Sequence, residues 1–366
     1  MSGCYDLHQL YKLGLEGKRQ RSAKRRKGFE LLWLPVLARI EVIRSMDIDE
    51  IIYFQTTMRK IFPCKSGLVI DKTSSSFRKS VAILKHLQSI ISFKSLCLHV
   101  NLKGMTAEFF KEILTEPSLR DFESLGLENG EIDAECLDLV MGMAQSNRNL
   151  HIKGTMIPRD YYHENAFKFH DIYYNDAEWV CIENLLTLKD SYSVNLGWNL
   201  LTQHDVNTFI KFWIDSDHDM IQSLSFRLLL AFRIERFFDD VVVLKGRPAI
   251  YLVVANPTKQ RKRPILRITC PPNGMLCLKS CFKDETFRLR GSLTDESWAP
   301  EYKVLMILNK KKELKGKLEE IQKLLETSQD QNMVERKNEI ARELENVSLE
   351  LDSLSFVLRD GVYSYT

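Results

Sequence analysis

A short apolar phrase recurs along the chain, and its spacing limits the folds open to it. The phrase reads FKSLCL at residues 93–98, FESLGL at 122–127 and IQSLSF at 221–226. The first two copies begin 122 − 93 = 29 residues apart, and the last two 221 − 122 = 99 apart, which is three or four such intervals. Further strand-like runs lie at 149–153, 167–173 and 192–197. A repeating strand is therefore the main element of the region from about residue 90 onward.

Helical segments separate these strand-like runs. MTAEFFKEIL follows Gly104, and LTQHDVNTFIKFWI follows Asn199. In the second segment, Thr202 followed by Asp205 is typical of a capped helix start. The apolar residues after it recur at helical spacing and predict one buried face: Val206, Phe209, Ile210 and Trp213.

One strand and one helix every 25–30 residues or so is the spacing of leucine-rich repeats. A unit of this size cannot bury its own apolar face, so neighbouring units stack into a sheet with helices outside. The sequence therefore predicts an α/β solenoid of degenerate repeats, whose concave strand face is the natural surface for a target. The alternative is an unrelated α/β domain whose strands are similar by coincidence.

Residues 240–290 are rich in β-strand patterns. The runs VVVLKG, AIYLVVAN, PILRITC and MLCLKSC are separated by the turn sequences PTKQRKRP and PPNG. We expect the basic turn Lys259–Arg263 to be a solvated hairpin tip, and a nucleic-acid contact is the alternative. Cys270, Cys277 and Cys281 lack the paired spacing of a zinc site, so core thiols are expected.

The C-terminal region, 301–360, has heptad spacing in two stretches separated by TSQDQN. The apolar positions are Ile307, Leu314, Leu318, Ile321 and Leu325, then Ile340, Leu344, Val347, Leu351, Leu354 and Leu358. This pattern predicts an antiparallel hairpin of two helices within one chain. The alternative is a coiled coil between two chains, which would make a homodimer.

The N-terminal region combines a basic tail with a compact apolar block. KRQRSAKRRK, at 18–27, holds seven basic residues, so the net charge of +3 leaves 3 − 7 = −4 on the rest. A mildly acidic body argues against an extended basic groove for nucleic acid. The tail is interpreted as a nuclear-import signal or a solvated segment, and salt-sensitive nucleic-acid binding is the alternative. The apolar block at 29–62 is predicted to be a bundle of about three short helices, too small to be very stable alone.

Several classes of function are not expected. No run of 18 apolar residues is present, nor a secretory signal in the first 20 residues. The phosphate-loop, dinucleotide, hydrolase-elbow and HExxH motifs are missing, and the eight histidines do not cluster. We therefore expect no catalytic residue, metal or cofactor. Scattered cysteines in apolar runs are typical of reduced thiols in the cytoplasm or nucleus.

Two segments carry a resemblance to a known family. LPVLARIEVIRSMDIDEIIYFQTTMRKI, at 34–61, resembles an F-box, the small helical bundle that binds the Skp adaptor of SCF ubiquitin ligases. Residues 185–226 look like the type-2 F-box-associated domain of the large nematode F-box family. The features that carry this second match are the Leu201-Thr202-x-x-Asp205 helix start and the Phe209-x-x-x-Trp213-Ile214 helix end, followed by an Ile-x-x-Leu strand.

The resemblance implies a substrate-recognition subunit of an SCF-type E3 ligase, with a cullin reached through the adaptor, and not an enzyme itself. The domains would be a tail (1–27), an F-box (28–70), a leucine-rich-repeat-like region (71–297) with the F-box-associated domain at about 160–240, and a helical hairpin or coiled coil (298–360). The other hypothesis is a structural scaffold that dimerises through its C-terminal helices. By resemblance, the adaptor-binding positions are Leu34, Pro35, Ile40, Ile43, Met46, Ile51 and Ile52.

Overall fold

The computed structural model divides the chain into residues 1–61 and residues 62–366. It describes residues 68–70, 77–78, 81–82, 84–85, 96–227, 233–246, 250–270, 274–288, 295–326, 331–354, 356–359 and 361–365. The predicted tail and the predicted helical bundle, including all seven adaptor-binding positions, lie outside these residues. In the described part, no helix is both long and apolar enough to cross a membrane.

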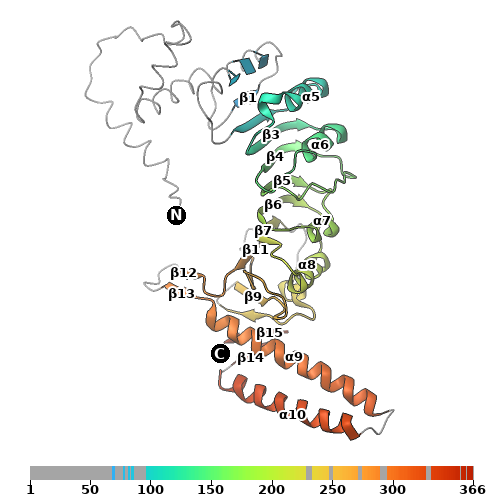
Figure 1. Ribbon diagram of the computed structural model, residues 1–366, viewed down its shortest axis with the longest axis vertical. Coiled ribbons are helices and arrows are strands. Elements are labelled where there is room, and N and C mark those ends of the chain that lie inside the picture. Colours follow the sequence, from blue (N-terminus) through green and yellow to red (C-terminus); the bar gives the residue numbers. More distant parts are fainter. Residues whose placement is uncertain are drawn as a thin grey trace, which may run out of the picture. The chain divides into compact units, whose positions relative to one another are not determined.

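The first half of the large sheet is parallel, and its strands are neighbours in chain order. These strands are β1 (Leu68–Ile70), β2 (Cys97–Asn101), β3 (Ser124–Glu131), β4 (Asn149–Met156), β5 (Asp171–Ala177), β6 (Ser191–Asn199) and β7 (Ile221–Arg227). The intervening helices are α5 (Ala107–Thr115), α6 (Ala134–Met141), α7 (Ile182–Leu186) and α8 (Gln203–Asp215). All four helices lie on one side of the strands (Figure 1).

The second half of the sheet is mainly antiparallel, in the order β7-β11-β10-β9-β8-β15-β14. Its strands are β8 (Leu244–Lys245), β9 (Ile250–Val254), β10 (Ile265–Thr269), β11 (Met275–Cys281), β14 (Phe356–Arg359) and β15 (Val362–Tyr365). A separate pair, β12 (Thr286–Arg288) and β13 (Asp295–Ser297), and the short 3-10 helix η4 (Ile234–Phe238) complete this part, and another 3-10 helix, η3 (Pro117–Leu119), lies between α5 and β3 in the parallel half. The described chain is thus mixed α/β, with one large sheet and two long C-terminal helices.

Ladders of buried side chains hold the parallel strands together. Registered positions on successive strands form one row: Leu98, Leu125, Leu150, Ile172, Val194 and Leu224. Every member of the row is at most 1% exposed. Because side chains alternate across a strand, each such row faces the helices and leaves the intervening positions on the opposite face.

The sheet has a core on each of its two faces, and they overlap only in the antiparallel half. In β9, Tyr251 and Val253 join the core beneath α5–α8, whereas Leu252 and Val254 join a second core. Trp298 and α9 (Ala299–Leu325) cover that second core. Burial on both faces explains why β9 reads as a continuous apolar run while β2 alternates.

The helix starts follow the local sequence. The Thr202 hydroxyl accepts a hydrogen bond from the Asp205 N–H, and the Asp205 carboxylate accepts one from the Thr202 N–H, so the predicted helix start is confirmed. In contrast, the apolar run at 167–173 was predicted to be strand throughout, yet β5 begins only at Asp171. Phe167 and Phe169 lie in the preceding turn and are buried, because the turn fills the core next to Tyr174.

The long helices α9 and α10 (Gln331–Asp352) pack antiparallel within this chain. The ion pair Lys303–Glu350 has an N–O distance of 3.6 Å, and Lys310–Glu343 one of 2.6 Å, so the partners run in opposite directions. The apolar seam between the helices includes Leu314, Ile340 and Val347.

The region 298–360 was predicted to be helical to its end, which is wrong: residues 356–359 are strand β14, and β15 pairs with β8. The Asp-Gly pair at 360–361 is a hairpin-turn sequence, which explains why the chain ends in two paired strands and not in a helix.

Candidate functional site

The face of the parallel strands opposite α5–α8, called here the polar face, is the candidate functional site. Its positions alternate with the buried ladders and are partly or fully exposed. They are Cys97, His99, Asn101, Ser124, Glu128, Asn149, His151, Lys153, Asp171, Tyr173, Asn175, Ser193, Asn195, Ser223, Ser225 and Arg227. In the antiparallel half, α9 and the second core cover the same side of the sheet. The polar face therefore ends where α9 begins.

The centre of the polar face is a cluster on β4 and β5. Tyr173 lies directly beside His151 in the strand register, and the two rings meet edge to face. His151 Nε2 lies 3.2 Å from Asp171 Oδ2, and Lys153 Nζ lies 5.4 Å from the centre of the Tyr173 ring. The hydrogen bond from His151 lowers the pKa of the Asp171 carboxyl, and burial opposes this shift. The cluster offers an aromatic ring with a cation and a carboxylate beside it.

A second aromatic and cationic pair lies at the ends of β6 and β7. The register between these strands shifts at Gly197, and Trp198 then pairs with Arg227. The guanidinium carbon of Arg227 lies 4.9 Å from the centre of the Trp198 ring, which is 47% exposed. Exposed aromatic and arginine side chains are the types most often found as anchors in protein interfaces.

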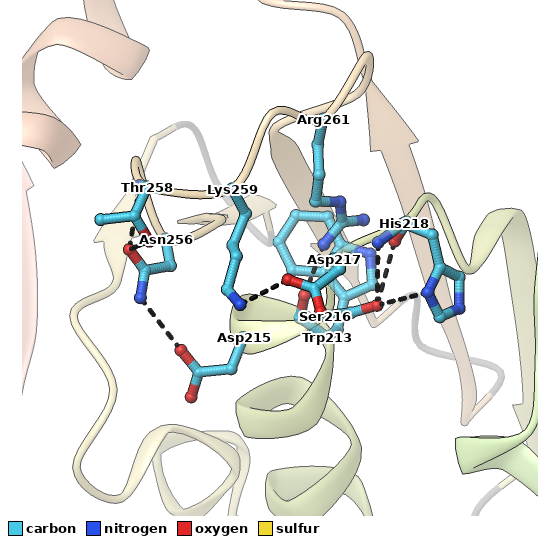
Figure 2. Close-up of polar contacts among 9 residues, drawn as sticks. All are labelled: Trp213, Asp215, Ser216, Asp217, His218, Asn256, Thr258, Lys259 and Arg261. Atoms are coloured by element: carbon cyan, nitrogen blue, oxygen red, sulfur yellow. Dashed lines mark hydrogen bonds and ion pairs between the residues drawn. The ribbon is translucent and has the colours of Figure 1, made fainter.

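The basic turn between β9 and β10 is not the solvated hairpin tip that its composition predicted. It lies against the acidic loop that follows α8, and Figure 2 shows their contacts. Lys259 forms an ion pair with Asp217 and lowers the pKa of that carboxyl, and Asn256 Nδ2 donates to Asp215 Oδ1 at 3.3 Å. The acidic loop is 42 residues away along the chain, so the local sequence could not predict that it lies against the basic turn.

Arg261 is the buried centre of this junction. Its side chain is 0% exposed, and its Nε lies 3.4 Å from Oδ1 of Asp219, whose side chain is 8% exposed. The guanidinium also donates to the Trp213 carbonyl and lies 4.0 Å above the Trp213 ring. Burial lowers the pKa of Arg261, and the charge of Asp219 opposes this shift. Trp213 in turn donates from Nε1 to Ser280 Oγ at 3.2 Å.

The three clustered cysteines occupy neighbouring strands. Cys277 pairs with Thr269 on β10, and Cys270 follows that strand. Burial raises the pKa of all three thiols, to about 11 for Cys281. Among the residues that the structure describes, no group of three or more His, Cys, Asp or Glu side chains could hold a metal ion.

Comparison with known proteins finds a family match within the parallel half of the sheet. The family model described as F-box associated matches residues 162–226, which span β5–β7. An E3 ubiquitin-protein ligase, hecw-1 of Caenorhabditis elegans, is 31% identical over 121 residues; the match covers 33% of this chain and 9% of that protein. No solved structure matches. The chain therefore contains an F-box-associated region, which supports that part of the resemblance.

Two buried residues of the matched region contact partners that lie beyond its C-terminal end. The partners of Trp213 and Asp219 come from residues 261–280, beyond the matched range. The sequence pattern identified Trp213 as a buried helix position but carried no sign of Arg261 as its partner. The four basic residues of the turn Lys259–Arg263 were the available signal, and they also fit a solvated turn.

Proposed function

We propose that this protein is a substrate-recognition subunit of an SCF-type ubiquitin ligase. The observation that carries the proposal is the F-box-associated match at 162–226, because its strands β5–β7 form half of the polar face, including Tyr173. The resemblance of 34–61 to an F-box supports an adaptor-binding segment ahead of it. The similarity to an E3 ubiquitin-protein ligase agrees with the ubiquitin context.

In this proposal the chain performs no chemistry itself. The F-box segment binds a Skp-type adaptor and through it a cullin, and the polar face holds a target protein near the ubiquitin-charged enzyme. Catalysis is then proximity, supplied by the assembly. The chain needs no cofactor for this role and acts in the cytoplasm, the nucleus or both. We interpret β2–β7 with their helices as degenerate repeats of the leucine-rich type.

The second candidate is a scaffold that dimerises through its C-terminal helices. One observation bears on it: α9 and α10 pack against each other within one chain and bury Leu314, Ile340 and Val347. That packing favours the role of recognition subunit, since the apolar seam is already occupied. Nucleic-acid binding through 18–27 remains a further alternative that salt-dependent binding would reveal.

The adaptor contact gives the first test. The double variant Leu34→Ala/Pro35→Ala should lose at least ten-fold in adaptor recovery, because apolar interface anchors cost about 1–4 kcal/mol each when truncated. The measurement is co-precipitation of the Skp adaptor with the full chain. Leu324→Ala, at a 51% exposed position on α9, is the matched control and should bind like wild type. Equal recovery by wild type and the double variant would exclude the F-box interpretation.

The target contact gives the second test. Tyr173→Ala removes the ring at the centre of the polar face and should reduce the recovery of target proteins about ten-fold, as for an aromatic anchor. Recovery is measured by affinity purification and mass spectrometry with the proteasome inhibited. Tyr162→Ala removes a ring that is 68% exposed in the turn before β5, and it should leave recovery unchanged. The same target list from both variants would rule out this face.

A further inference from the structure

A cavity lies at the carboxyl end of the parallel sheet. It lies where β2 and β3 end and α5 and α6 begin, and its volume is about 310 Å³. Its apolar lining consists of Leu102, Met105, Ala107, Phe110 and Ile132, with the Cys136 thiol. The polar lining consists of Thr106, Glu131 and Asp133. The cavity therefore combines an apolar wall with two carboxylates, Glu131 and Asp133, called here its acidic rim.

The rim is net negative. Asp133 caps α6 by accepting a hydrogen bond from the Cys136 N–H at 2.7 Å, and this bond lowers the pKa of the Asp133 carboxyl. The lining thus carries two carboxylates, Glu131 and Asp133, and no cationic side chain, beside the N-termini of α5 and α6, whose partial positive charges are together smaller than the charge of two carboxylates. The nearby Lys111 is held by Glu135 at 2.7 Å, so its charge is already compensated.

The cavity wall is chemically inert. Burial raises the pKa of Cys136 to about 12, with a further contribution from Asp133, so the thiol stays protonated near neutral pH. Its Sγ lies 4.0 Å from the Ala107 carbonyl oxygen. The side chain therefore acts as part of the apolar wall, and neither a covalent occupant nor a metal suits it.

We propose that this cavity receives a lysine or arginine side chain of the target polypeptide. The aliphatic stem of such a side chain suits the apolar wall, and its cation suits the acidic rim. An anionic occupant would meet two carboxylates, and a purely apolar one would leave the rim uncompensated. The proposal deepens the recognition role and rests on it, since the occupant is taken to be part of a target protein.

The cavity can be tested without knowing the target. The probes are n-pentylammonium and n-pentylguanidinium, with hexanoate as the anionic analogue, added to the full chain labelled with ¹³C at methionine methyls. Met105 lines the cavity, and Met156, which is 57% exposed at the end of β4, reports non-specific effects. Both cationic probes should move the Met105 signal in a saturable way, and hexanoate should bind at least ten-fold more weakly.

Two variants test the charge and the shape of the cavity separately. Glu131→Gln with Asp133→Asn removes the charge while Asn keeps a side-chain oxygen for the α6 cap, and it should weaken the cationic probes at least ten-fold. Ala107→Leu should fill the cavity and abolish the shift. Hexanoate binding as tightly as the ammonium, an unmoved Met105, or an unchanged shift in Ala107→Leu would each overturn the proposal.

A final comparison distinguishes this proposal from the recognition role. If the adaptor and target tests fail while the cationic probes still move Met105, the recognition role is wrong and the cavity chemistry stands. If Tyr173→Ala loses targets but Glu131→Gln/Asp133→Asn keeps them all, the cavity does not hold a target side chain, and the proposal fails. Loss of a subset of targets in the charge variant is the supporting result.

Discussion

Replacing Arg261 by methionine is expected to lower the free energy of unfolding by about 3–5 kcal/mol, the cost of removing one partner from a buried ion pair. The Arg261 side chain is 0% exposed, and its partner Asp219 is 8% exposed. Methionine fills much of the space but leaves the Asp219 carboxylate buried without its cation. The change also removes the cation above the Trp213 ring and the donor to the Trp213 carbonyl.

Chemical denaturation followed by tryptophan fluorescence is the measurement, because Trp213 reports directly on the junction. Lys262→Met is the matched control: its side chain is exposed on the same turn, and it should change stability by less than about 0.5 kcal/mol. Arg261→Met combined with Asp219→Asn should recover part of the loss, since no uncompensated charge remains. If Arg261→Met unfolds no more easily than Lys262→Met, the buried pair does not stabilise the junction.

Replacing Gly197 by alanine is the second substitution with a large expected effect, a destabilisation of about 3 kcal/mol, at the upper end for overpacking. A Cβ at Gly197 would lie 2.2 Å from the Asn175 backbone oxygen, which cannot move without distorting β5. Gly197 lies at the register shift that brings Trp198 to Arg227, so the same change should also disturb that pair.

Gly316→Ala is a control for which the opposite change, an increase in stability, is expected. Gly316 lies in α9, where a new Cβ would meet no atom within 4 Å, and alanine should stabilise the helix by about 0.5–1 kcal/mol. Thermal unfolding of both variants under one condition gives the comparison. A Gly197→Ala protein as stable as wild type would show that β5 and β6 tolerate a wider separation than the structure has.

The strands were largely predictable, because each is specified by alternation over a few residues. The phrases ending at Leu127 and Phe226 both became strands of the sheet, β3 and β7. Helix α8 was predictable from Thr202 and Asp205, since a capping box is a contact over three residues. The heptad positions correctly indicated two long helices, although Leu358 belongs to a strand.

The candidate site was less predictable. The strand face was expected as a target surface, but none of its residues had been identified. His151 and Asp171 are 20 residues apart, and Trp198 and Arg227 come from different strands, so only the sheet register brings each pair together. The predicted adaptor positions, Leu34 to Ile52, lie outside the described residues and stay a prediction.

Short-range periodicity and capping encode the repeating strands and the helix starts, and a local residue pattern carries the resemblance to the F-box-associated region, so all three can be recognised in the sequence. The tertiary structure decided which strands become neighbours, and therefore which charges meet. Lys259 and Asp217 are 42 residues apart, and their pairing depends on β11 lying between β7 and β10. The burial of Arg261 likewise depends on residues that are distant in the sequence. A guanidinium in a basic turn stays in water unless a carboxylate and a ring, both supplied by distant chain, compensate its transfer to the interior.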